Sequence, residues 1–134
     1  MRQFQEIEHT ADWAFRVRGR DLAQLFANAA RGMFELQGSA ARAGNKIARE
    51  VAVGGVDRET LLVNWLNELL YLQETQQETY NCFEILEISD TNLRALVHGR
   101  PHRPEGKLIK AVTFHGLEVR QSGDGWEATI VVDV

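Results

Sequence analysis

The sequence predicts an α+β fold in which two helices pack on one mixed or mainly antiparallel sheet. Two stretches carry apolar residues at steps of three and four positions, which is the period of an amphipathic helix. The rest of the chain divides into short β-rich runs separated by turn residues. The order is strand, helix, strand, helix and then several strands, which is typical of α+β proteins.

The first helix is expected from Leu22 to about Gln37. Asp21 can cap its N-terminus, Gln24 completes a weak capping box, and Gly38 stands where helices commonly end in the left-handed conformation. The apolar stripe of this helix consists of Leu22, Leu25, Phe26, Ala29, Met33 and Leu36.

The second helix is expected from Arg58 to about Glu74, with Asp57 as its N-cap. It has a wider apolar face than the first, so we expect it to be the most buried helix. This face consists of Leu61, Leu62, Trp65, Leu66, Leu69, Leu70 and Leu72.

The remaining elements are strands, recognised by alternating or β-branched runs. Two connections, 89–92 and 122–125, have the composition of hairpin turns, and 38–45 is a surface connection without periodicity. The strands are expected near residues 3–8, 13–18, 47–53, 82–88, 93–98, 109–114, 117–121 and 126–132.

Length and composition indicate one ordinary folded domain over residues 1–134. The chain is 44% hydrophobic and 25% charged, which disfavours wholesale disorder, and no segment is long enough to be a linker between two domains. It carries 15 Lys and Arg against 19 Asp and Glu, a net charge of −4. A protein that coats nucleic acid non-specifically is therefore disfavoured.

Cys82 is the single cysteine, so the chain can form neither an internal disulfide nor a thiolate metal cage. We expect it to be a small core residue. No apolar run resembles a signal peptide or reaches the ~18 residues of a membrane span. These features predict a cytoplasmic protein that does not enter a membrane.

Polar groups gather in residues 8–13, between two predicted strands. If Trp13, Phe15 and Val17 face the core, alternation places Asp12 and Arg16 on the opposite face. Asp12 is thus a candidate functional carboxylate. The alternative is a local turn in which it hydrogen-bonds the backbone.

The other candidate carboxylates lie at the C-terminus. An apolar strand with Trp126, Ala128, Ile130 and Val132 on one face runs directly into Asp133 and Val134, so we expect this end to be tied down. Two carboxylates ~4 Å apart repel by about 1 kcal/mol in water, and a hard divalent cation reverses that cost. Oxygen ligands favour calcium, magnesium or manganese. The alternative is two solvated charges.

The remaining charged candidates are less specific. Arg16, Arg18 and Arg20 project to the same side as Asp12 and could face phosphates or an acidic partner, although a salt-bridged sheet face is the commoner explanation. Lys110 opens a predicted strand and can be its polar edge. The four histidines form no metal-ligand motif, and no hydrolase, kinase or dehydrogenase signature occurs.

Four segments, taken in order, resemble the archease family over nearly the full length. They are Glu8-His9-Thr10-Ala11-Asp12, then Leu61 to Tyr71 (LLVNWLNELLY), then Lys110 to His115 (KAVTFH), and the terminal Val131-Val132-Asp133-Val134. The resemblance implies an α+β fold made of two related strand–helix–strand–strand units.

The resemblance also implies a function. Archeases are accessory proteins, not enzymes, that activate the RtcB-type RNA ligase of tRNA splicing and RNA repair by promoting its guanylylation and multiple turnover. They bind a divalent metal, usually described as calcium, and carried over by motif the ligands here are Asp12, Asp133 and Val134. RNA is then contacted only indirectly, through the ligase.

This sequence departs from the family pattern at two positions. Leu108 stands where an acidic residue is frequent, two places before Lys110. Glu105 is close enough in sequence to substitute for it, although a surface loop carboxylate is the commoner explanation. Phe114 stands where tyrosine is common.

Two other functional classes remain open. A metal-dependent phosphohydrolase could use Asp12, Asp133 and His9. A small-ligand binding module would enclose an apolar pocket between its strand–helix units.

Overall fold

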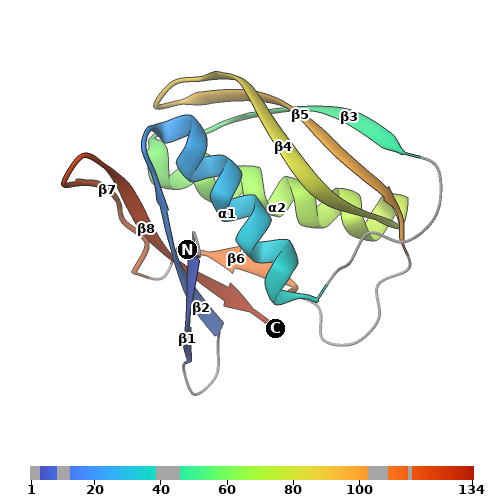
Figure 1. The fold of residues 1–134 in the computed structure, drawn as a ribbon, viewed down its shortest axis with the longest axis horizontal. Coiled ribbons are helices and arrows are strands. Elements are labelled where there is room, and N and C mark those ends of the chain that lie inside the picture. Colours follow the sequence, from blue (N-terminus) through green and yellow to red (C-terminus); the bar gives the residue numbers. More distant parts are fainter. Residues whose placement is uncertain (1–3, 9–12, 39–45, 103–108, 115) are drawn as a thin grey trace.

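The computed structural model describes residues 4–8, 13–38, 46–102, 109–114 and 116–134. Within these ranges the chain forms two helices and eight strands (Figure 1). The helices lie between two antiparallel sheets, and their apolar side chains fill the space between them. The α+β class is confirmed.

The predicted helix α1 spans Leu22–Leu36. The Asp21 side chain accepts a hydrogen bond of 2.8 Å from the backbone N–H of Gln24, and the Gln24 side chain accepts one of 2.7 Å from the N–H of Arg20. Gly38, with φ of 70°, ends the helix in the left-handed region. The predicted cap and C-terminal glycine are therefore confirmed. The capping box is only approximated, because the Gln24 side chain bonds the N–H of Arg20 and not that of the N-cap Asp21.

Helix α2 spans Arg58–Gln76. The backbone N–H of Thr60 donates to the Asp57 carboxylate at 2.7 Å, and this bond lowers the pKa of Asp57. The expectation that α2 is the more buried helix is wrong: eight of its 19 residues are buried, against eight of 15 in α1. Both helices contact both sheets, but α2 is exposed at Asn64, at Tyr71 and over its last three residues, whereas α1 is exposed only at Arg31 and Glu35.

The strands form two sheets, and not the single sheet predicted. In the five-stranded sheet the order is β1 (Phe4–Glu8), β2 (Trp13–Gly19), β8 (Gly125–Asp133) and β6 (Ala111–Thr113), with β7 (Val119–Ser122) also paired to β8. In the three-stranded sheet the order is β3 (Ile47–Gly54), β5 (Asn92–Pro101) and β4 (Glu78–Ile88). Alternation in a sequence identifies strands but does not say which sheet each one joins.

The core is one continuous cluster that extends from sheet to sheet through both helices. Trp65 of α2 is fully buried, and its indole Nε1–H donates to the carbonyl of Phe26 in α1 at 3.0 Å. The largest fully buried side chains are Trp65, Tyr80, Phe15, Phe26, Leu25, Met33, Leu61, Leu62, Leu66, Leu69, Ile130 and Val17.

Two strand–helix–strand–strand units build this architecture. The inserted unit is β3, α2, β4 and β5, and its strands lie in the order β3-β5-β4. The outer unit is β2, α1, β6 and β8, with β7 paired to β8, and its strands lie in the matching order β2-β8-β6. The inserted unit occupies the chain between α1 and β6. The two related units that the resemblance implied are therefore present, one inside the other.

Equivalent side chains in the two units are separated by a constant interval. Gln37 and Gln73 stand 36 positions apart and exchange two amide hydrogen bonds of 3.1 Å. At the same interval, Asn28 donates to the Arg18 carbonyl and Asn64 donates to the Gly54 carbonyl, both at 2.7 Å. The interval also relates the N-caps Asp21 and Asp57 and the close-packed Gly19 and Gly55.

Cys82 is exposed, so its predicted place in the core is wrong. The register of β4 against β5 shifts between Tyr80 and Cys82, which marks a β-bulge. The extra residue changes the phase of the alternation, so Tyr80 and Phe83 point inward while Asn81 and Cys82 point outward.

Candidate functional site at the end of β8

The last strand is held on both sides up to its final residues. Trp13 of β2 is registered with Val132, and Ala111 of β6 is registered with Asp133. Val134 packs, partly buried, against the core. The expectation that this end of the chain is tied down is therefore confirmed, as is the inward direction of Ala128, Ile130 and Val132.

Asp133 carries an exposed side chain at the C-terminal end of β8, an interior strand of the five-stranded sheet. Its backbone carbonyl accepts a hydrogen bond of 2.7 Å from the backbone N–H of Lys110. Lys110 is also exposed. The structure thus brings together two of the predicted functional residues, from segments that are distant in the sequence.

Three predicted site residues, His9, Asp12 and Glu105, lie outside the described residues, as does Leu108. Trp13, the residue that follows Asp12 in the chain, stands opposite Val132, the residue that precedes Asp133. The described residue that follows the first predicted ligand segment and the strand that carries Asp133 therefore belong to one strand pair.

The side chain and terminal group at this strand end are oxygen ligands of the type that a hard cation prefers, but they are too few to fill its coordination shell. Asp133 and the Val134 α-carboxylate offer oxygen ligands, whereas calcium takes about 6–8 oxygens. Among the residues that the structure describes, no cluster of three or more His, Cys, Asp or Glu side chains is placed to bind a metal.

Side-chain amides hold β6 from the helical side, a feature that sequence reasoning missed. Asn67 of α2 accepts from the N–H of Val112 at 2.8 Å and donates to the Val112 carbonyl at 3.2 Å. Gln37 accepts from the N–H of Ile109 at 3.1 Å. The available signal was Asn67 itself, a polar residue within the second family segment.

The arginine stripe lies on the outer face of the five-stranded sheet. Arg18 and Arg120 both pair with Glu127, at 3.6 and 2.6 Å, so the salt-bridged explanation holds for this part of the stripe. Arg16 is half-buried and lines a depression of about 240 Å³ together with Thr129. Phe114, at the family tyrosine position, is 55% exposed.

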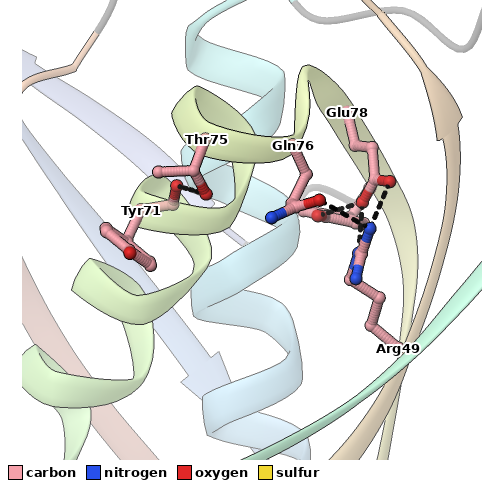
Figure 2. Close-up of polar contacts among 6 residues, drawn as sticks. Arg49, Tyr71, Thr75, Gln76 and Glu78 are labelled. Carbon is pink, nitrogen blue, oxygen red and sulfur yellow. Dashed lines mark hydrogen bonds and ion pairs between the residues drawn. The ribbon is translucent and has the colours of Figure 1, made fainter.

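A second polar cluster lies in the three-stranded sheet (Figure 2). Arg49 binds both carboxylate oxygens of Glu78, at 2.6 and 2.8 Å, and also the Gln76 side chain at 3.1 Å. The Tyr80 hydroxyl donates to Glu78 at 2.6 Å. The bonds with Arg49 lower the pKa of Glu78 and raise that of Arg49, while burial raises the pKa of Tyr80. The cluster ties the C-terminal end of α2 to β3 and β4.

In the described part of the chain, neither helix is long and apolar enough to cross a membrane.

Comparison with known proteins gives consistent matches. A family model described as the Archease protein family (MTH1598/TM1083) matches residues 4–134. The chain is 37% identical to the Protein archease of Methanosarcina acetivorans, over 99% of this chain and 97% of that protein. The solution structure of Methanobacterium thermoautotrophicum protein 1598 is 30% identical with a TM-score of 0.72, and covers 100% of both chains. The crystal structure of a Thermotoga maritima archease, described as a possible chaperone, has a TM-score of 0.69 at 23% identity, over 97% and 96% of the chains.

Proposed function

Because this chain belongs to the archease family, we propose that it is a metal-binding accessory protein that activates an RtcB-type RNA ligase. In this role it promotes transfer of guanylate onto the ligase and allows many turnovers, in tRNA splicing or RNA repair. The protein supplies no reacting group of its own. The ligase performs the chemistry and contacts the RNA.

One observation supports the proposal more than any other. Trp13 and Val132 are partners in the β2–β8 pair, and in the sequence they are the immediate neighbours of Asp12 and Asp133. Asp133 is exposed there, with Lys110 next to it. Carboxylates from distant segments are what a hard cation needs in order to gain several oxygen ligands at once.

We assign the cation to Asp12, Asp133 and the Val134 carboxylate. When bound, calcium would neutralise these mutually repelling groups and present positive charge to phosphate oxygens. The role of β2, β6 and β8 is to hold the carboxylates at the surface, where a partner can reach them. Lys110 would add a second positive charge beside the same strand end.

The coordination shell is expected to be completed by the partner. Three carboxylates leave positions open for water, a main-chain carbonyl or a ligase group. Calcium affinity should therefore rise when ligase is present, and ligase affinity should rise by the same factor when calcium is present. Calorimetric titration of calcium with and without ligase measures this coupling, and equal affinities in the two titrations would remove it.

The decisive experiment is a multiple-turnover RNA ligation assay with a cognate RtcB-type enzyme, with and without this protein. Asp133→Asn removes a proposed ligand. It should therefore lower calcium affinity by more than the roughly 10–100-fold that is typical when a residue hydrogen-bonded to a ligand is removed, and it should abolish activation. Because the side chain is exposed, stability should change by no more than about 0.5 kcal/mol. Asp124→Asn, at an exposed carboxylate in the β7–β8 turn, is the matched control and should activate like wild type.

Failure of the wild-type protein to stimulate ligation would overturn the proposal. Sustained release of phosphate from nucleotides by the protein alone, with metal, would favour the phosphohydrolase instead. Both measurements use the same purified chain.

A further inference from the structure

We infer that Asn67 is a positioning residue for the proposed site: it fixes β6 in the place that keeps Lys110 beside the main chain of Asp133. The inference rests on the proposed function. It adds to it a residue that acts through β6 and does not itself contact the metal or the ligase.

The contact is specific to the backbone of β6. The amide of Asn67 is bonded to both the N–H and the carbonyl of Val112, at 2.8 and 3.2 Å. One side chain therefore satisfies both main-chain groups with which Val112 faces α2, as a neighbouring strand would. On its other edge, Val112 is registered with Val132 of β8.

The strand needs this support because its own pairing is short. β6 has three residues, all paired to β8, and the edge facing α2 is held by side chains. Gln37, fixed by its reciprocal bonds with Gln73, holds the N–H of Ile109 just before the strand. Lys110 lies between these two anchors, at Ile109 and Val112, and its N–H donates to Asp133.

The repeated architecture does not account for Asn67. The position in α1 that corresponds to it, 36 residues earlier, is Arg31, which is exposed and donates to Asn28 on its own helix. The strand that corresponds to β6 is β4, which has 11 residues and extensive pairing with β5. The amide support of the third strand thus distinguishes the unit that carries Asp133 and Lys110.

Asn64 provides a matched control on the same helix. Its side-chain amide also donates to a backbone carbonyl, that of Gly54 on β3, at 2.7 Å. Asn64→Ala therefore removes a similar hydrogen bond that serves the other sheet. A general loss of stability would appear in both variants, whereas a positioning role would appear at position 67 alone.

The test compares wild type, Asn67→Ala and Asn64→Ala by two measurements. Amide hydrogen exchange should accelerate by about tenfold or more at Val112 and Lys110 in Asn67→Ala, with no such local change in Asn64→Ala. Calcium affinity, measured by calorimetry, should fall by about tenfold or more in Asn67→Ala and stay at the wild-type value in Asn64→Ala. If Asn67→Ala does not fold, Asn67→Leu keeps the branched shape and a strong helix former.

The possible failures are distinguishable. Unchanged exchange at Lys110 would overturn the positioning role, as would an equal loss of calcium affinity in the two alanine variants. Absence of calcium binding by the wild type would overturn the proposed function, and with it the site that Asn67 is inferred to serve.

Discussion

The outer unit and the inserted unit begin alike and end differently. Each opens with a strand that leads through a close-packed glycine to an aspartate-capped helix, and each helix sends an asparagine amide back to that strand. The inserted unit then continues into the long β4, secured by the Arg49–Glu78 pair. The outer unit instead has the short β6, secured by amides, and the exposed end of β8.

The features that the two units share build the helix layer, and the features in which they differ lie beside the proposed site. The shared first half builds the helix layer and is repeated at the same interval. The third strand varies: in one unit it is anchored by charge and length, and in the other it is left short beside Lys110 and Asp133. The two units therefore differ in their second halves, and the proposed site lies in the second half of the outer unit.

The largest effect on stability should come from Trp65, the large side chain that α2 contributes to its contact with α1. Trp65 and Ala29 occupy equivalent positions, and both are fully buried. Trp65→Ala should lower the free energy of unfolding by about 3–5 kcal/mol because it leaves a large cavity and removes the bond to Phe26. Ala29→Gly should cost about 1 kcal/mol. Urea denaturation measures both, and similar losses would show that the two helices contribute equally.

A smaller and matched effect is expected at the two close-packed glycines. A Cβ at Gly19 would lie 2.3 Å from the Leu25 nitrogen, and one at Gly55 would lie 2.6 Å from the Leu61 nitrogen. Each alanine substitution should cost about 1–3 kcal/mol, since backbone must shift. Gly54→Ala is the control, because its nearest contact would be an ordinary 3.5 Å. If the alanine substitution at Gly19 or at Gly55 left the free energy of unfolding unchanged, the two glycines would not be structurally equivalent.

The smallest effect should appear with pH, through the Arg49–Glu78 pair of the inserted unit. Arg49 lowers the pKa of Glu78 in the folded state, so the unfolded chain binds the proton first as the pH falls. The stability from this pair is complete above the usual glutamate pKa and is lost as the pH drops through the lowered one. Unfolding free energy should fall less steeply below about pH 4.3 in Glu78→Gln than in wild type. If the plots of unfolding free energy against pH were parallel for the two proteins, the loss of stability in acid would come from other carboxylates.

Local signals predicted the helices well and the assembly less well. Asp21, Asp57 and Gly38 marked helix ends because capping depends on residues next to each other in the chain. The division into two sheets and the bulge before Cys82 depend on pairing between distant segments, which alternation does not encode. The relation between the units was also readable in principle, since Asn28 and Asn64, and Gln37 and Gln73, share one interval.

The candidate site was predicted in part. Asp133 and Lys110 were identified from charge pattern and resemblance, and the structure places their backbones in contact. The role of Asn67 could not be predicted, because it depends on how α2 passes the free edge of β6. The metal-ligand assignments to Asp12, Asp133 and Val134 stay predictions.

The nesting of one unit inside the other also sets an order of assembly. During synthesis all the strands of the three-stranded sheet, and both helices, emerge before β8. The edge of β2 that is not paired with β1 must therefore wait for a partner strand made much later. The β2–β8 pair can therefore form only after both helices and the three-stranded sheet have been synthesised. A nascent chain that ends before β8 would expose the edge of β2 that β8 covers in the folded protein.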